Sequence, residues 1–361
     1  MNNTFCILST VLLAAFIIPL NSSCAPGVQA QAERNQSEGE TDRDDDAPLV
    51  QLGTVRDSRI SESSGLARSS AAEGAYWTHN DSGNAPEIYL LAPDGRLLAE
   101  VAIEDVQNRD WEAMSSVSVN GANFIMIGEV GDNARRYRVY RLLLIPEPLL
   151  SDDVLRAVKE DVDGFESQKY TATALQFEFT YEDGRHNCEA IAYDSVGKKV
   201  WLVEKVYADD QREAAPGIYS IDFNLTDEML QQARGDGVSL PQASRVADFP
   251  VRNVTGMSIS AEGNRLLIRT YLAAFFYSRD EERSWAEVLA EDRPANIGLP
   301  LQRQGEAVCF SSDSDHFVVT SESTRQAIWQ VNLRAQLDPP AETVPADEDE
   351  DAGGTSNEDG G

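Results

Sequence analysis

The sequence predicts an all-β protein folded as a β-propeller of five four-stranded blades. A short motif recurs five times, and in each copy a polar residue is followed by Gly or Ala, an apolar run, a turn and a second apolar run. Self-similarity at a spacing of several tens of residues is typical of repeat proteins, and radially repeated four-stranded units form propellers. The five copies begin at Ser64, Glu112, Glu189, Thr255 and Glu306.

Within each repeat, residues that favour turns separate runs of strand-forming residues. Two polar insertions lengthen the repeats, at 151–168, where we expect a helix, and around 228–237. The expected strands are 65–68, 76–79, 87–91 and 97–103 in the first repeat, 113–119, 124–130, 138–144 and 174–180 in the second, 190–193, 200–204, 217–223 and 246–249 in the third, 256–260, 265–271, 274–277 and 297–301 in the fourth, and 307–310, 316–320 and 327–331 in the fifth.

The fifth repeat supplies only three strands, and one expected strand at 50–55 precedes the first repeat. An N-terminal strand that completes the last blade closes the ring, and closure removes the exposed sheet edges. About 285 residues shared among five blades exceeds the usual ~40–50 residues per blade, so six blades is the alternative. The five motifs and two insertions favour five.

The two ends of the chain differ from the repeats in composition. Residues 1–30 contain no Lys, Arg, Asp or Glu and hold an apolar run, which predicts a signal peptide and an exported protein, whether periplasmic, outer-membrane lipoprotein or extracellular. The residues up to Cys24 resemble a lipoprotein box, so a lipid anchor at Cys24 and a cleaved soluble form are the two alternatives. The acidic segments 31–47 and 337–361 are predicted to be disordered, on either side of a propeller over 48–336.

The chain carries 61 acidic and 30 basic residues, a formal net charge of −31. This charge opposes binding to nucleic acid and to anionic membrane surfaces, and it favours cations. Membrane association is therefore expected only through a lipid at Cys24. Cys188 and Cys309 stand at the starts of different repeats, so we expect two buried free thiols.

In a propeller, the loop that enters the innermost strand and the loop that leaves the second strand lie at the same end of the central channel. Motif carboxylates at these places should therefore converge, and such a cluster needs a counter-charge. Hard oxygen ligands of this kind suit Ca2+. The alternative is that these side chains cap backbone amides or form turns. The candidate metal ligands are Glu112, Glu189, Glu306, Asn80, Asn133 and Asp132.

Other polar residues near the same loops are candidates for chemistry. Glu204, Glu322 or His79 is the candidate catalytic base. Arg269 and Tyr271 are the candidate substrate-binding residues, with Arg269 either holding an anionic group or neutralising the carboxylates. A single histidine at the end of a strand is more often structural, and that alternative stays open for His79.

The order of the motifs resembles a family of secreted bacterial propellers related to those with the esterase-like activity of phytase. The resemblance implies the propeller fold and an ester-cleaving activity. The proposed Ca2+ site is similar to that of calcium-dependent lactonase and phosphotriesterase propellers, by analogy of the site alone. The matching segments are 77–83, 110–112, 131–133, 147–148, 181–184, 189–190, 254–256, 269–271, 304–307 and 321–322.

We therefore expect an exported calcium-binding propeller that hydrolyses a phosphoester, carboxylic ester or lactone at the mouth of the channel. Its partner would be a small-molecule or anionic ester substrate. The alternative is a non-catalytic propeller that binds a ligand or a protein partner at the same mouth.

Overall fold

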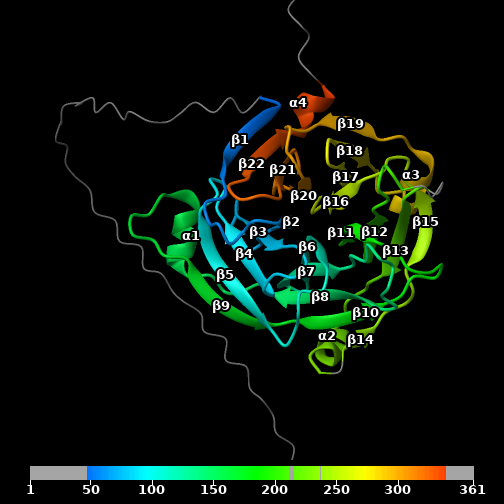
Figure 1. Cartoon of the computed structure of the whole chain (residues 1–361), viewed down its shortest axis with the longest axis horizontal. Coiled ribbons are helices and arrows are strands. Elements are labelled where there is room, and N and C mark those ends of the chain that lie inside the picture. The colour runs from blue at the N-terminus through cyan, green and yellow to red at the C-terminus, as the bar shows by residue number, and fades with distance from the viewer. Residues whose placement is uncertain (1–46, 211–214, 236, 339–361) are drawn as a thin grey trace, which may run out of the picture. The chain divides into compact units, whose positions relative to one another are not determined.

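The computed structural model describes residues 47–210, 215–235 and 237–338. In these residues, five sheets are arranged around a common centre, which confirms the predicted five-bladed β-propeller (Figure 1). The expected signal peptide, the lipid-bearing Cys24 and the acidic segment up to residue 46 lie outside the described residues, as does the tail beyond residue 338. No helix within the described residues is long and apolar enough to cross a membrane.

Each blade begins with its innermost strand. Blade 1 contains β2 (Ser63–Arg68), β3 (Tyr76–Asn80), β4 (Glu87–Leu91) and β5 (Leu97–Glu104). Blade 2 contains β6 (Trp111–Val119), β7 (Ala122–Glu129), β8 (Tyr140–Pro146) and β10 (Leu175–Phe179). Blade 3 contains β11 (Cys188–Asp194), β12 (Lys199–Glu204), β13 (Gly217–Asp222) and β15 (Ser244–Asp248).

Blade 4 contains β16 (Val254–Ile259), β17 (Arg265–Thr270), β18 (Ala273–Ser278) and β19 (Ala295–Gly298). Blade 5 contains β20 (Gly305–Phe310), β21 (His316–Ser321), β22 (Ala327–Asn332) and the N-terminal β1 (Leu49–Thr54). β1 pairs antiparallel with β22, from Leu49 opposite Val331 to Thr54 opposite Ala327. The N-terminal strand therefore closes the ring as predicted, which leaves no open seam between the first and last blades.

The first insertion contains the expected helix, and each insertion also adds a strand that was not expected. The first forms α1 (Asp152–Lys159) and then β9 (Gln168–Thr173), which pairs in parallel with β5 and so adds a fifth strand to the preceding blade. The second forms α2 (Asp227–Ala233) and β14 (Val238–Ser239), which pairs in parallel with β10 of blade 2. Both short strands cover sheet edges that would otherwise be exposed.

Two further helices were not expected. α3 (Trp285–Glu291) begins with a capping box between Ser284 and Glu287, and it buries Trp285 against blades 3 and 4. This capping-box pattern was visible in the sequence as a Ser followed three residues later by a Glu. α4 (Leu333–Leu337) follows the last strand and begins at the Asn332 cap.

The core consists of apolar layers between neighbouring blades. Trp77, Trp111 and Trp201 are fully buried there, and Trp329 packs at the edge of its cluster. The innermost strands contact one another in the cyclic order β2, β6, β11, β16 and β20, around the centre of Figure 1. The innermost strands thus form a closed ring around the central channel. Cys188 and Cys309 are buried free thiols, as expected.

Candidate functional site

The five motif residues all lie at irregularities where the innermost strand begins. In each blade, the pairing between the first and second strands shifts register at this position, which leaves an extra residue on the innermost strand. Such β-bulges redirect a side chain out of the regular pleat and are common beside functional sites. We call these five the bulge residues: Ser64, Glu112, Glu189, Thr255 and Glu306.

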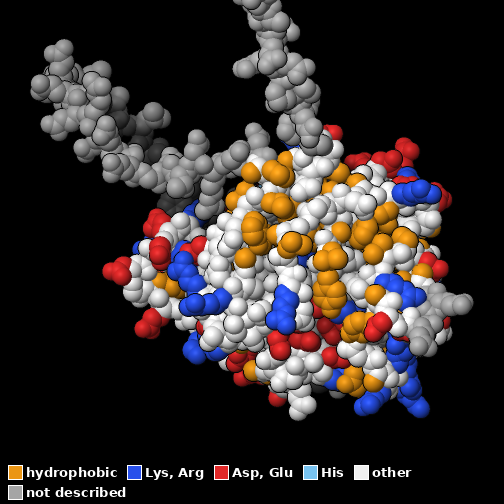
Figure 2. Space-filling model, turned by 45° about the horizontal axis from the view of Figure 1, so that its top comes forward, with side chains coloured by type: hydrophobic (Ala, Val, Ile, Leu, Met, Phe, Trp, Pro, Cys, Tyr) orange, Lys and Arg blue, Asp and Glu red, His pale blue; other side chains and the backbone are white. Residues whose placement is uncertain are grey.

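A second set of side chains comes from the residue that directly follows the second strand of each blade. Three of these residues donate their backbone N–H to a carbonyl of the loop that enters the innermost strand, which holds both loops at one end of the channel. We call this set the strand-end residues: Asp81, Val130, Lys205, Tyr271 and Glu322. Together with Asp110, the two sets bring six carboxyl groups to the mouth of the channel, those of Asp81, Asp110, Glu112, Glu189, Glu306 and Glu322. Figure 2 shows one face of the protein, where acidic side chains gather beside basic and hydrophobic ones.

Lys205 is the counter-ion of two bulge residues. Its Nζ forms an ion pair with Glu189 and lies 3.7 Å from Oε1 of Glu306. The Nζ also lies 5.1 Å from the ring centroid of Tyr271 and 5.3 Å from that of Tyr207. Burial lowers the pKa of Lys205, but the two carboxylates raise it by more, so its pKa lies above the ordinary value. The ammonium group is therefore charged at neutral pH.

A second group of carboxylates at the mouth forms no ion pair with any residue that the structure describes. One oxygen from each of Asp81, Asp110 and Glu112 lies within 4.8 Å of the others, and we call this group the acidic cluster. The Glu112 side chain is buried, with 4% of the residue exposed. Within the part of the chain that the structure describes, its carboxylate makes no hydrogen bond or ion pair. The acidic cluster can therefore hold a metal ion.

Burial, together with the crowding of negative charge, shifts the pKa of every member of the acidic cluster upward. Burial, followed by the charges of Glu189 and Asp81, raises the pKa of Glu112 well above its usual range. Burial raises the pKa of Asp110 to about 6, and burial also raises the pKa of Asp81. Each shift means that the ionised form lacks enough positive charge nearby, which a proton or a cation can supply.

Gly131 provides the space that the acidic cluster occupies. A Cβ atom at this position would overlap Oε1 of Glu112 and would lie 2.6 Å from Cγ of Asp110. Its backbone N–H donates to the carbonyl oxygen of Asp110 at 3.3 Å. Any other residue at position 131 would displace the carboxylates, which explains the Gly in the motif at 131–133.

Glu322 lies on the side of the mouth nearest Glu306. Its Oε2 accepts a hydrogen bond from Nε2 of Gln304 at 2.6 Å. Burial raises the pKa of Glu322, and the neighbouring Glu306 raises it further, to about 8. The Glu322 carboxyl group is therefore protonated at neutral pH and can donate a proton, whereas the sequence-based expectation was a base.

The two candidate substrate-binding residues have different environments. Arg269 is fully buried between blades 4 and 5, where it donates to the carbonyl oxygens of Ala307 and Thr320 and to Gln302. Its donors are thus directed at the protein rather than at a ligand, and burial lowers its pKa. Tyr271, in contrast, is partly exposed beside Lys205 at the mouth.

The other two candidate bases are also committed elsewhere. His79 is fully buried against Trp111, with Nδ1 2.9 Å from the Asn80 carbonyl oxygen, and burial lowers its pKa to about 4. It therefore stays neutral and lies inside the core. Burial raises the pKa of Glu204, but hydrogen bonds from His186 and Arg135 lower it by more, so its pKa lies below the usual value. We therefore assign neither residue a catalytic role below.

Three candidate metal ligands hold loops together. Asn80 accepts the backbone N–H groups of Ser61 and Glu62, and its amide donates to the Arg59 carbonyl. This geometry matches the turn and capping alternative. Its side-chain oxygen already accepts two hydrogen bonds, so it is a poor ligand for a metal ion.

Asp132 and Asn133 follow the same pattern. The Asp132 carboxylate accepts the N–H groups of Arg136 and Tyr137 at 2.7 and 2.8 Å. Asn133 is exposed, and its side-chain oxygen accepts the Tyr207 hydroxyl at 2.8 Å. The structure therefore brings Glu112, Glu189 and Glu306 together at the mouth, and it leaves these two residues in the loop beside it.

One residue of the site, Asp110, was not predicted from the sequence. Asp110 lies in the loop directly before β6, two positions from Glu112, and the motif at 110–112 was the available signal. Lys205 occupies the strand-end position of blade 3, so its place at the mouth was predictable. Its pairing with Glu189 was not predictable, because side-chain packing decides which of the three glutamates at the mouth Lys205 contacts.

No protein-family model matches this sequence, and a comparison with curated proteins gives no match. The resemblance to the phytase-related propellers therefore stays a prediction. The chain is similar to the solved structure of a gluconolactonase of Xanthomonas campestris, with 11% identity, a TM-score of 0.39, and coverage of 79% of this chain and 89% of the other. It is also similar to the glutaminyl cyclase of Myxococcus xanthus, with 8% identity, a TM-score of 0.41, and coverage of 78% and 95%. A third similar structure is the periplasmic gluconolactonase of Pseudomonas aeruginosa, with 11% identity, a TM-score of 0.38, and coverage of 72% and 65%.

Proposed function

We propose that this protein is an exported calcium-binding propeller that hydrolyses a small ester or lactone at the channel mouth. The observation that carries the proposal is the buried Glu112 carboxylate, which has no partner among the described residues and lies in the acidic cluster. A buried carboxylate without a counter-charge is strongly unfavourable, so the site needs a bound cation or a proton.

The donor set suits calcium better than softer metals. Asp81, Asp110 and Glu112 offer only carboxylate oxygens, which Ca2+ and Mg2+ prefer, whereas zinc sites draw on His and Cys. These three residues would hold the ion, and Glu189 and Glu306 would remain paired with Lys205. When bound, Ca2+ supplies a positive charge that polarises a substrate oxygen and lowers the pKa of a bound water.

The remaining groups at the mouth suit hydrolysis. The reaction adds water across the bond between the acyl carbon and the leaving oxygen: the hydroxyl joins the carbon and the leaving oxygen takes a proton. Glu322, protonated at neutral pH, is the candidate acid for that proton. Lys205 supplies a fixed positive charge that would stabilise the negative charge developing on the substrate's carbonyl oxygen. Tyr271, beside Lys205, would contact the substrate.

The charge of the mouth favours neutral substrates over phosphoesters. The bulge and strand-end residues, together with Asp110, bring six carboxyl groups to the mouth, and Arg269 directs its donors at the protein, so no arginine clamp faces this mouth from that position. An anionic phosphoester would meet net repulsion here, whereas a lactone or carboxylic ester would not. A neutral ester or lactone is therefore the substrate class that we propose.

One observation favours the non-catalytic alternative. Lys205 already pairs with Glu189 and Glu306, and an ion pair of this kind can have a purely structural role, here the joining of blades 3 and 5. In that case the mouth binds a small ligand or a protein partner, with or without calcium, and turns nothing over.

Calorimetric titration of calcium into the EDTA-treated full-length protein tests the cation. We expect saturable binding with a Kd on the order of micromolar, weakened at least ~10-fold in Glu112→Gln and in Asp110→Asn. Glu73→Gln is the matched control, because Glu73 is exposed on a loop of blade 1 and also loses one charge. Equal binding in all variants, or no binding, would remove calcium from the proposal.

Turnover is then measured with the same calcium-loaded protein and three substrates: dihydrocoumarin, p-nitrophenyl acetate and p-nitrophenyl phosphate. We expect hydrolysis of the first two, loss of activity in Glu322→Gln, and retained calcium binding in that variant. Calcium binding with no turnover of any substrate would support the non-catalytic alternative. Turnover of the phosphate alone would overturn the proposed substrate class.

A further inference from the structure

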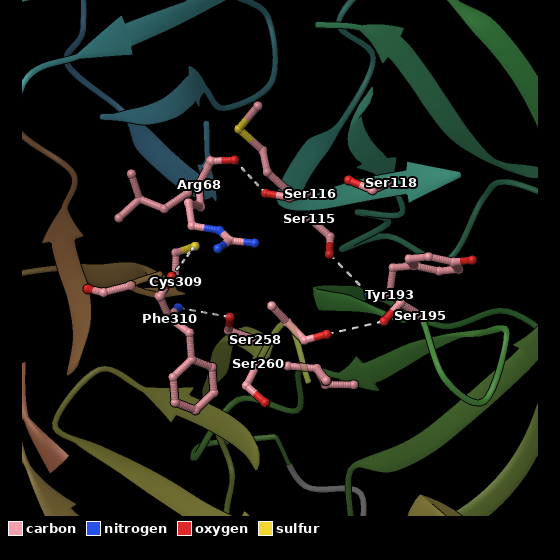
Figure 3. Close-up of a pocket in the computed structure, with 15 residues that line it drawn as sticks. Arg68, Ser115, Ser116, Ser118, Tyr193, Ser195, Ser258, Ser260, Cys309 and Phe310 are labelled. Carbon is pink, nitrogen blue, oxygen red and sulfur yellow. Dashed lines mark hydrogen bonds between the residues drawn. The ribbon is translucent and has the colours of Figure 1, made fainter. Parts of the chain in front are cut away.

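The end of the channel opposite the acidic mouth holds a pocket of a different chemical character. Its cavity measures about 120 Å³, and residues from the innermost strands of all five blades or from the loops that follow them line it. The lining contains seven serines, Arg68 and Cys309, and no Asp or Glu is among the lining residues that the structure describes. We call it the serine-lined pocket. It is shown in Figure 3.

Arg68 is the only charged residue among the described residues that line this pocket. It ends β2, and its backbone carbonyl accepts the Ser116 hydroxyl at 2.6 Å, which holds the main chain in place. Figure 3 shows its guanidinium group pointing toward the middle of the pocket. Within the described part of the chain, that group makes no hydrogen bond or ion pair.

The charge of Arg68 interacts with the carboxylate of Glu262, a residue that does not line the pocket. Burial raises the pKa of Glu262, but the hydrogen bond from Ser314 and smaller contributions, the last of them the positive charge of Arg68, lower it by more, so its pKa lies below the usual value. No ion pair joins Glu262 to Arg68 within the described residues. The guanidinium group thus keeps its five N–H donors available in a hydroxyl-lined pocket.

Two serines on other blades add donors from different directions. Ser115 accepts the backbone N–H of Tyr193 at 3.1 Å, and Ser258 accepts that of Phe310 at 3.1 Å. An accepting hydroxyl keeps its own proton, so each can still donate to a ligand. In Figure 3 both residues lie around the space into which the Arg68 guanidinium points. Donors on β2, β6 and β16 therefore converge from separate sides of the channel.

We propose that the serine-lined pocket binds a small tetrahedral oxyanion, such as phosphate or sulfate, through the guanidinium group of Arg68 and the hydroxyls of Ser115 and Ser258. Arginine binds such anions with two parallel hydrogen bonds, and hydroxyls at other angles complete a tetrahedral rather than a planar set of acceptors. The volume suffices for several water molecules, each of which occupies roughly 30 Å³ in the liquid, and hence for one such anion.

This site is separate from the proposed hydrolase. Glu112 and Ser116 lie four residues apart on β6, which corresponds to about 13 Å along a strand. The acidic mouth repels anions and attracts cations, whereas the opposite end presents an arginine whose guanidinium group has no partner among the described residues. The channel thus carries opposite charge preferences at its two ends, and the anion site does not depend on calcium or on turnover.

Calorimetric titration of the full-length protein with sodium phosphate, sodium sulfate and sodium acetate at constant ionic strength tests the proposal. We expect saturable binding of phosphate and sulfate and at least ~10-fold weaker binding of acetate. In Arg68→Gln, the affinity for phosphate should fall at least ~10-fold. The control is Arg138→Gln, which removes the same charge from an exposed arginine of blade 2 and should bind phosphate like the wild type.

Arg68→Lys keeps the charge but loses the paired donors, so it should bind phosphate with an intermediate affinity. Thermal unfolding of each variant without phosphate checks that the fold is intact, and phosphate should raise the Tm of the wild type but not that of Arg68→Gln. Equal phosphate affinity in Arg68→Gln and the wild type, no saturable binding, or equal affinity for acetate would each overturn the proposal.

Discussion

The ammonium group of Lys205 forms a buried ion pair with the carboxylate of Glu189, at the point where the channel of the propeller opens. The two side chains are only 4% and 5% exposed. Lys205 comes from the end of the second strand of blade 3, and Glu189 from the bulge that begins its first strand. The protein itself therefore supplies the positive charge beside Glu189 and Glu306, through Lys205. Glu112 belongs to the acidic cluster, where we propose that an external cation binds.

Replacing Lys205 with Met should destabilise the protein strongly. The change leaves Glu189 and Glu306 buried without their counter-ion, which costs about 3 kcal/mol or more in the free energy of unfolding. Denaturation in urea measures it. Lys199→Met is the control, because Lys199 pairs with Asp222 at the surface and its loss should cost less than ~1 kcal/mol. Adding Glu189→Gln to Lys205→Met should recover part of the loss, and no recovery would show that the two residues do not act as a pair.

Glu322 should make the stability of the protein fall as the pH rises. Its folded-state pKa of about 8 exceeds the ordinary carboxyl value of 4.5, so the folded state holds a proton that the unfolded state has released. The free energy of unfolding therefore decreases between about pH 4.5 and pH 8 through this group. Urea denaturation of the calcium-free protein across this range should show a smaller decrease in Glu322→Gln, which stays neutral. An identical pH dependence in the two proteins would contradict the assignment.

Replacing Gly131 with Ala should disrupt the acidic cluster. The added methyl group would overlap Oε1 of Glu112 and the carboxyl carbon of Asp110. We expect a loss of roughly 1–3 kcal/mol in the free energy of unfolding and at least ~10-fold weaker calcium binding. Gly235→Ala is the control, since its new methyl group would meet nothing closer than 3.8 Å. Unchanged calcium affinity in Gly131→Ala would argue against a cation at this place.

Glu147 should contribute to stability and not to function. Its carboxylate accepts the indole N–H of Trp77 at 2.9 Å, the Ser69 hydroxyl at 2.5 Å and the Ser70 N–H at 3.1 Å, which joins blades 1 and 2. Glu147→Ala would leave the buried indole N–H without a partner, at a cost of about 1–3 kcal/mol. Calcium and phosphate affinities should match those of the wild type, and a change in either would indicate that the motif at 147–148 serves a site.

The repeat pattern explains which parts of the site were predictable. Each motif residue follows the same structural rule, a bulge at the start of an innermost strand, so one pattern in the sequence placed Glu112, Glu189 and Glu306 at one end of the channel. The partners of long side chains follow no such rule. Arg269 directs its donors at backbone carbonyls of the next blade because Gly305 leaves it room, and a Cβ atom at position 305 would overlap Nη2 of the arginine.

The sequence by itself determined the number of blades, the closure of the ring by the N-terminal strand, and the end of the channel at which the carboxylates converge. These features follow from the period of the hydrophobic pattern and from turn residues, which act locally. Only the tertiary structure decided that Lys205 neutralises Glu189 and Glu306, that Asp81, Asp110 and Glu112 stay together with no ion pair to any described residue, and that Arg68 points into a serine-lined pocket. Those outcomes depend on distances between side chains on different blades, and charges interact strongly only at short range and in buried surroundings.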